Sequence, residues 1–217
     1  KRVLEQAVEA QHSELALMKE SQNRIRFLQH DFKNHLIAIE NYAKRSDCTA
    51  ITEYIKECFG FLSMDQQLVE TGNPEIDSIL NYKLLEMKKK GISLDYSVVI
   101  PQELKIRGFD INVILGNLLN NAIEAMEKTT RKVFSLHIYF DKNILFIHMK
   151  NTHDGNIIEH GEGLLTTKKN KSYHGLGLKS VTSILEQYDG DIMYSHDDHQ
   201  FTTDVMICNI DLKDKFE

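Results

Sequence analysis

The sequence predicts an α+β protein in which a long helical hairpin is followed by an α/β two-layer sandwich. Two observations carry this prediction. Over the first 45 residues, apolar residues recur at alternating steps of four and three, which is the spacing of a seam between packed helices. After a polar break at residues 71–74, helical and strand periods alternate, which favours helices packed on a sheet. We therefore expect the hairpin in residues 1–71 and the sandwich in residues 72–217.

The hairpin is expected to turn at residues 46–49, a short polar break between two helical patterns. Asp47 and Thr49 are both suitable helix-capping residues, so either could begin the second helix. A break this short predicts antiparallel neighbours. Because the hairpin has too little mass to cover its own apolar seam, we predict a homodimer in which two copies form a four-helix bundle.

Composition argues against several classes of function. The chain of 217 residues has a formal net charge of −6, which disfavours nucleic acid as a partner. Its three cysteines form no C-x-x-C pair, which fits a reducing compartment. No apolar run approaches the roughly 20 residues of a membrane-spanning helix. Because the sequence begins without methionine and already within the heptad pattern, we expect a preceding segment in the whole protein.

Periodicity and turn residues divide the remainder of the chain into helices and strands. Gly91 is expected to end one helix, Asp110 to cap another, and residues 141–143 to form a hairpin turn. Residues 151–174 have no clear period, and residues 196–199 are expected to be a solvated turn. The expected helices are 75–90, 110–128 and 176–188, and the expected strands are 93–99, 134–140, 144–149, 191–195 and 201–210.

His30, Asp31 and Asn34 form the first candidate site. His30 is one position past the heptad seam, on the helix flank, where its side chain can reach solvent. Its imidazole is a suitable nucleophile, and the adjacent carboxylate can hold the proton of the other ring nitrogen. Asn34 lies about one turn further on and can orient a water molecule. The alternative is a solvated surface pair with no catalytic role.

Asparagines on the helix expected at residues 110–128 form the second candidate site. Asn117 and Asn121 are four residues apart and share one face, with Asn120 in the same turn and Glu124 beyond. Asparagine is a mediocre helix former, so this grouping asks for an explanation. An amide oxygen is a hard, neutral ligand that suits Mg²⁺, and an amide can also donate to phosphate. The alternative is an ordinary polar helix surface.

Gly175 and Gly177 open the last expected helix and form the third candidate site. Unobstructed N–H groups at a helix N-terminus favour an anion. The basic segment just before them includes Lys168 and Lys169 and has the character of a loop that closes over phosphates. The sequence lacks the P-loop pattern.

Residues 30–36, 117–125 and 175–180 together resemble the sensor histidine kinases of bacterial two-component systems. They resemble in particular the agr-type, peptide-quorum-sensing branch with its GHKL-type ATPase domain. The resemblance implies a dimerising phosphotransfer hairpin followed by an ATP-binding domain of the GHKL or Bergerat type. It also implies ATP and Mg²⁺ as cofactors, a response-regulator receiver domain as partner, and a cytoplasmic location below a membrane-anchored sensor region.

The resemblance also implies roles for individual residues. His30 would be the phosphoacceptor, Asp31 its acid–base partner, and Asn34 would position water during dephosphorylation of the partner. Asn121 would coordinate Mg²⁺, and Asn117 would contact the metal or the phosphates. The glycines at positions 175 and 177 would lie beside the triphosphate, and Lys168 or Lys169 would reach it from a lid.

Two departures from the family pattern concern nucleotide binding. The family has Asp-x-Gly-x-Gly where this sequence has residues 151–155, so Asn151 stands where an aspartate reads the adenine amino group. A neutral amide forms a weaker bond than a carboxylate, by about 1 kcal/mol. His174 replaces a glycine of the glycine box. The asparagine at position 151 motivates a rival to an active kinase, a phosphatase or relay scaffold with little use of ATP. A third alternative is a purely structural coiled-coil dimer that carries an inert α+β domain.

Overall fold

The computed structural model places most of the chain, in two compact units, Lys1–Ser63 and Met64–Glu217, each described by itself. None of the helices in the described ranges is long and apolar enough to cross a membrane. The residues described are 19, 22, 26, 29–59, 67–155, 158–160, 164–166, 176–208 and 210.

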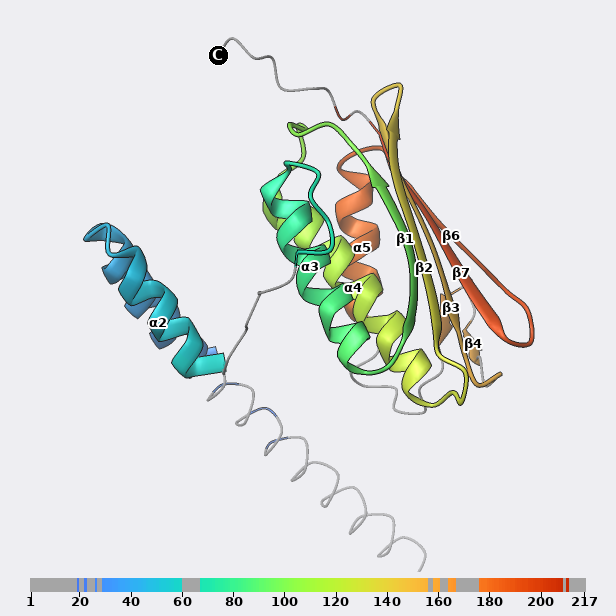
Figure 1. Cartoon of the computed structure of the whole chain (residues 1–217), viewed down its shortest axis with the longest axis horizontal. Coiled ribbons are helices and arrows are strands. Elements are labelled where there is room, and N and C mark those ends of the chain that lie inside the picture. Colours follow the sequence, from blue (N-terminus) through green and yellow to red (C-terminus); the bar gives the residue numbers. More distant parts are fainter. Residues whose placement is uncertain are drawn as a thin grey trace, which may run out of the picture. The chain divides into compact units, whose positions relative to one another are not determined.

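In the first unit, a helix over residues 29–44 is followed by α2, Cys48–Phe59 (Figure 1). The turn between them is stabilised by Asp47, whose Oδ1 accepts a hydrogen bond of 2.9 Å from the Ala50 backbone N–H. Asp47, one of the two residues predicted to cap the second helix, therefore fills that position, because a carboxylate satisfies an N–H that the helix leaves unpaired.

Contacts across the turn hold the two helices antiparallel. His35 Nδ1 lies 2.9 Å from Tyr54 Oη and 3.5 Å from Cys58 Sγ. Phe32 and Leu36 remain 57% and 50% exposed, so the hairpin does not cover its own apolar side chains. Pairing with a second copy stays a prediction, and most of the N-terminal heptad seam lies outside the described residues.

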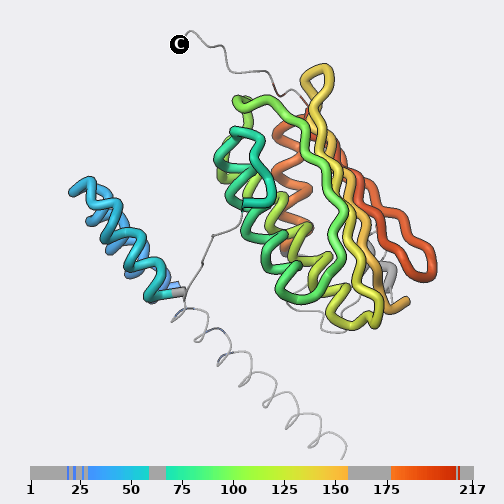
Figure 2. Tube along the Cα trace, in the orientation of Figure 1, coloured from blue at the N-terminus to red at the C-terminus, as the bar shows by residue number. Residues whose placement is uncertain are grey.

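The second unit is an α+β sandwich in which α3, α4 and α5 cover one face of a mixed sheet (Figure 2). The predicted two-layer α+β architecture is therefore confirmed for this unit. Its elements are α3 Pro74–Lys89, β1 Ser93–Val99, α4 Gly108–Glu127, β2 Val133–Asp141, β3 Ile144–Thr152, β4 Ile158–His160, β5 Leu164–Thr166, α5 Leu176–Glu186, β6 Asp191–His196 and β7 Gln200–Ile207.

The main sheet has the strand order β1-β2-β3-β7-β6. The β1–β2 pair is parallel and the other pairs are antiparallel. A parallel pair needs a crossover, and α4 supplies it between β1 and β2. The small antiparallel pair β4–β5 was not predicted, because its two strands of three residues are too short to establish a period.

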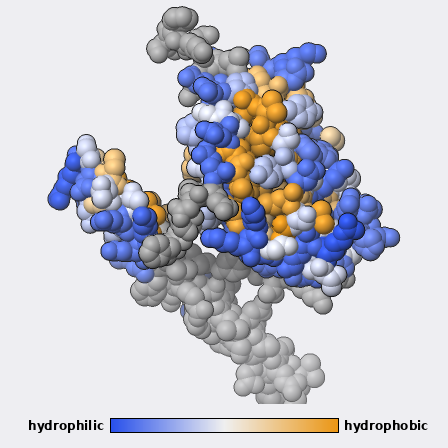
Figure 3. All heavy atoms as spheres, in the orientation of Figure 1, coloured by the Kyte–Doolittle hydropathy of each residue, from blue (hydrophilic) through white to orange (hydrophobic). Residues whose placement is uncertain are grey.

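Alternation along the central strands builds the core between the sheet and the helices. Every second residue of β2 and β3 is buried, while their neighbours point to the opposite face. Hydrophobic residues also come to the surface on the face shown in Figure 3. On the edge strand β1, the half-buried Leu94 and Val98 pack against the core. The buried strand residues are Phe134, Leu136, Ile138, Leu145, Ile147 and Met149.

Turn residues end the elements largely where the sequence predicts. Gly91 has φ +72° directly after α3, which is the left-handed conformation that ends many helices. Lys142 and Asn143 have φ of 48° and 63°, which fits a two-residue hairpin turn between β2 and β3. The prediction that Asp110 caps α4 is wrong: Arg107 is the N-cap residue, and Asp110 lies buried in the first turn.

Candidate functional site

His30 is exposed on its helix, and two polar side chains meet one of its ring nitrogens. The ring is 71% exposed, so a phosphoryl donor can reach it. Asp31 Oδ1 lies 3.5 Å from His30 Nδ1, and Asn34 Nδ2 lies 3.3 Å from the same nitrogen. The structure therefore brings together all three residues of the first candidate site, through a helical spacing of one and four residues.

Asp31 and Asn34 both contact Nδ1 of His30. Whether Nδ1 donates or accepts in these contacts determines whether Nε2 is a nucleophile. When Nδ1 carries the proton, it donates to Asp31, and Nε2 keeps a lone pair for nucleophilic attack. When Nδ1 instead accepts from the Asn34 amide, Nε2 carries the proton and is no nucleophile. The contact with Asp31 thus favours the reactive tautomer, and the contact with Asn34 favours the other. A carboxylate beside the ring would also stabilise positive charge that develops on it.

Asn117 and Gly177 bring the second and third candidate sites together. Asn117 is half-buried on α4 and donates through Nδ2 to the Val113 carbonyl at 2.8 Å. This bond turns Oδ1 toward the first turn of α5, where Gly177 lies. A Cβ added at Gly177 would overlap Asn117 Oδ1 and would lie 3.2 Å from Asn117 Cγ. With any other residue at position 177, the Asn117 amide or the start of α5 would have to shift.

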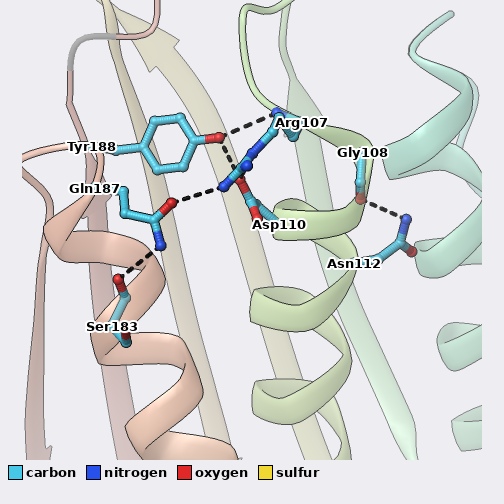
Figure 4. A network of polar contacts seen from close by, with 7 residues as sticks. All are labelled: Arg107, Gly108, Asp110, Asn112, Ser183, Gln187 and Tyr188. Carbon is cyan, nitrogen blue, oxygen red and sulfur yellow. Dashed lines mark hydrogen bonds and ion pairs between the residues drawn. The ribbon is translucent and has the colours of Figure 1, made fainter.

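A polar network joins the start of α4 to the end of α5 (Figure 4). Tyr188, just past α5, donates a 2.6 Å hydrogen bond to Asp110 Oδ2, and Arg107 Nε donates to the same oxygen at 2.6 Å. Arg107 also donates to the Gln187 side chain at 2.7 Å. Burial and the bond to Asp110 raise the pKa of Tyr188. The contact between residues 117 and 177 lies at the start of α5 and the middle of α4, whereas this network lies at the end of α5 and the start of α4.

The remaining polar residues of α4 extend the candidate site by one turn. Asn121 is exposed, and Glu124 is half-buried beyond it. Within the described ranges, no group of three or more His, Cys, Asp or Glu side chains is arranged to hold a metal ion. The amide oxygens of Asn117 and Asn121 are hard, neutral donors of a kind that suits Mg²⁺.

Asn151 lies at the end of β3 on the helix-facing side of the sheet. It continues the buried row of Leu145, Ile147 and Met149, and it is 6% exposed. Its Nδ2 donates to the Thr152 carbonyl at 3.0 Å. Its Oδ1 is an acceptor, which is the type of group that a ligand amino group would require. Because α4 packs against β3, Asn151 faces the same layer as the asparagines of α4.

Some predicted site residues lie outside the described residues, and some contacts in the structure were not predicted from the sequence. Lys168, Lys169, His174 and Gly175 lie outside the described residues. Sequence reasoning missed the Tyr188–Asp110 bond, which joins residues 78 positions apart. It also missed the buried His153, because no helical or strand period marks the segment in which it lies.

Residues 106–208 match the model of a protein family described as the GHKL domain. The match runs from just before α4 to the end of β7, so it includes Asn117, Asn121, Asn151 and Gly177. A comparison with curated proteins found no match.

Several solved structures have a similar fold. The catalytic domain of the histidine kinase ThkA is 17% identical, over 64% of this chain and 94% of that chain, with a TM-score of 0.49. A mycobacterial sensor histidine kinase, MprB, is 11% identical over 61% and 94%, with a TM-score of 0.45. The Acinetobacter baumannii histidine kinase AdeS is 12% identical over 82% and 97%, with a TM-score of 0.45. These likenesses concern the fold alone and carry no argument about activity.

Proposed function

We propose that this chain is a histidine autokinase of a two-component signalling system. It transfers the γ-phosphoryl group of ATP to His30 and then to an aspartate of a response regulator. The observation that carries the proposal is the packing of Asn117 against Gly177, within the region that matches the GHKL domain. The exposed His30, flanked by Asp31 and Asn34, supplies an acceptor in the same chain.

In the second unit, the chain's own groups would bind and orient the nucleotide. Asn121 and Asn117 would hold Mg²⁺ and the phosphates through their side-chain amides, since α4 offers amide oxygens on one face. Gly177 in the first turn of α5, together with the preceding Gly175, would provide backbone N–H groups beside the triphosphate. Lys168 would add a positive charge from the preceding segment. When bound, Mg²⁺ would neutralise charge on the transferring phosphate.

In the first unit, His30 would accept the phosphoryl group through Nε2. The Nε2 lone pair forms the new bond to the γ-phosphorus while the bond from phosphorus to the bridging oxygen breaks, and ADP leaves with that electron pair. Asp31 keeps the proton on Nδ1 and stabilises the charge on the ring. Asn34 would orient a water molecule when the regulator is later dephosphorylated.

The proposal assigns residues 1–71 to dimerisation and phosphotransfer and residues 72–217 to ATP binding. The active form would be a homodimer, because the exposed Phe32 and Leu36 of one hairpin need a cover. A receiver domain would dock beside His30. Within this class, the resemblance of the motifs favours the agr-type, quorum-sensing branch, anchored to the membrane through a preceding sensor region.

Calorimetric titration of ATP, with and without Mg²⁺, tests nucleotide binding directly. We expect Mg²⁺-dependent binding by the wild type and a loss of that dependence in Asn121→Ala. Asn112→Ala is the matched control, because Asn112 is also exposed on α4 but lies at the start of the helix, where its side chain donates to the Gly108 carbonyl. Wild-type protein that binds no ATP would contradict the proposal.

Asn151 favours a second candidate, a response-regulator phosphatase or phosphorelay scaffold that uses ATP poorly. A neutral amide at this position holds an amino group more weakly than a carboxylate would. This candidate predicts that the chain removes phosphate from a phosphorylated receiver domain, while its affinity for Mg²⁺-ATP is too weak to saturate at cellular concentrations.

A further inference from the structure

A single buried imidazole holds the segment that follows β3. His153 is 6% exposed, and both of its ring nitrogens are hydrogen-bonded. The Gly155 backbone N–H donates to Nδ1 at 2.9 Å, and Nε2 lies 2.9 Å from the Asp197 carbonyl. A carbonyl can only accept, so Nε2 carries the proton and donates. The geometry therefore requires the neutral imidazole, with the proton on Nε2 and the Nδ1 lone pair accepting from the Gly155 N–H.

The Asp197 carbonyl belongs to the turn between β6 and β7, and hydrogen bonds within the turn stabilise it. Asp197 Oδ1 accepts 2.8 Å hydrogen bonds from the backbone N–H groups of His199 and Gln200. The His153 backbone N–H donates to the His199 carbonyl at 3.0 Å. The imidazole thus joins the end of β3 to a turn that has its own internal bonds, more than 40 residues further along the chain.

This contact lies two residues from Asn151, the side chain placed to read the base. Asn151 is paired with Phe201 of β7, and Thr152 with Gln200, in the last two register positions before the turn. The Gln200 backbone N–H also donates to Asp197 Oδ1, so the same few residues fix both the turn and the end of β3. Displacement of the segment after β3 would therefore move Asn151.

We infer that His153 is a positioning residue for recognition of the nucleotide base, by fixing the β3 end against the β6–β7 turn. The inference rests on the proposed function and deepens it. The chemistry recognised is an exocyclic amino group, such as that of adenine, donated to Asn151 Oδ1. Where the family pattern has its first glycine, this chain uses an imidazole to set the backbone after β3.

Three variants of His153 separate its two bonds. His153→Ala removes both. His153→Asn retains an acceptor for the Gly155 N–H, since an asparagine side chain commonly bonds the backbone two residues on. His153→Gln retains a side-chain N–H donor that is long enough to reach the Asp197 carbonyl. His199→Ala is the control, because His199 is exposed and contributes its backbone to the turn.

The measurements are the affinities for ATP and GTP and the steady-state autophosphorylation constants, with folding checked by circular dichroism. We expect His153→Ala to weaken ATP binding about tenfold, as for the loss of two hydrogen bonds, with GTP binding little changed. KM for ATP should rise while kcat stays within about twofold. The ATP affinities of His153→Asn and His153→Gln should lie between those of His153→Ala and the wild type. His199→Ala should have the affinity of the wild type.

Two results would overturn the inference while leaving the proposed function intact: unchanged ATP binding in His153→Ala, or an equal loss for ATP and GTP. An equal loss would mark a purely structural role, because base recognition would not be affected selectively. If the wild type bound no nucleotide, the proposed function would fail, and this inference would fail with it.

Discussion

Gly177 lies so close to Asn117 that a methyl group on its Cα would overlap the amide oxygen of the asparagine. The first turn of one helix and the middle of another are thereby held in van der Waals contact. In the proposed nucleotide site, this contact places backbone N–H groups beside a candidate metal ligand. The absence of a side chain at position 177 is thus part of the site.

Gly177→Ala should therefore impair nucleotide binding. The added Cβ must push α5 away from Asn117 or turn the amide out of the site, and either change disturbs phosphate binding. We expect Mg²⁺-ATP affinity to fall by roughly tenfold or more, as for loss of an interaction worth about 1.4 kcal/mol. Equilibrium titration with a fluorescent ATP analogue measures the change.

Gly116→Ala is the matched control for that substitution. Gly116 precedes Asn117 on α4, and a Cβ there would meet no atom within 4 Å. Because alanine has a higher helix propensity than glycine, stability should rise by up to about 1 kcal/mol, with ATP affinity unchanged. Equal losses of affinity in the two alanine variants would show that the Asn117 contact is not the cause.

Tyr188→Phe should destabilise the second unit by about 1–3 kcal/mol, because it leaves the buried Asp110 carboxylate with one bond fewer. Tyr188 and Arg107 donate to the same oxygen of Asp110. Urea denaturation of the two proteins gives the difference in unfolding free energy. Tyr139→Phe serves as control, since Tyr139 is 47% exposed on the outer face of the sheet. Equal stability of wild type and Tyr188→Phe would refute this role.

The regular elements of the fold were predictable because their periods are local. The strand at residues 93–99 has the predicted bounds, and the helices and the hairpin around Asn143 differ by a few residues at their ends. The error at Asp110 has a physical cause. Aspartate is a common cap, but here the carboxylate is used by Tyr188, which lies 78 residues away and leaves no mark in the local pattern.

The candidate site was predictable in its members but not in its geometry. Helical spacing alone places Asp31 and Asn34 beside His30, since residues one and four apart meet on a helix. The contact between Asn117 and Gly177 depends on tertiary packing of two helices, so only the residue types were visible in the sequence. His153 was missed for the same reason, because its partner belongs to a distant turn.

Asp31→Asn should lower the rate of autophosphorylation by at least about 100-fold, the usual effect of losing an acid–base group. The amide can no longer hold a proton on Nδ1 as a charged acceptor, so the nucleophilic tautomer is less populated. Single-turnover phosphorylation at saturating ATP measures the rate. ATP affinity should be unchanged, because Asp31 belongs to the hairpin. A wild-type rate in this variant would exclude an acid–base role for Asp31.

Acid should weaken the turn between β6 and β7. Hydrogen bonds from the backbone N–H groups of His199 and Gln200 lower the pKa of Asp197 below its ordinary value. A lowered carboxyl pKa contributes stability above the unfolded-state value, near 4, and that contribution is lost as the pH falls through the folded-state value. Below about pH 5, the unfolding free energy of Asp197→Asn should therefore depend less on pH than that of the wild type.

Denaturant titrations at a series of pH values test this difference between wild type and Asp197→Asn. Asp198→Asn is a suitable control, because Asp198 is an exposed neighbour in the same turn. We expect it to keep the pH dependence of the wild type. Parallel curves for all three proteins would mean that the bonds to Asp197 contribute nothing that depends on its charge.

Transfer of label from γ-labelled ATP to His30 is the most direct test of the central claim. The wild type, His30→Gln and His35→Gln would be incubated with Mg²⁺ and labelled ATP, and the label tested for lability. The proposal predicts acid-labile, alkali-stable label on the wild type and on His35→Gln, and none on His30→Gln. Undiminished label on His30→Gln, or an unlabelled wild type that also binds no ATP, would contradict it.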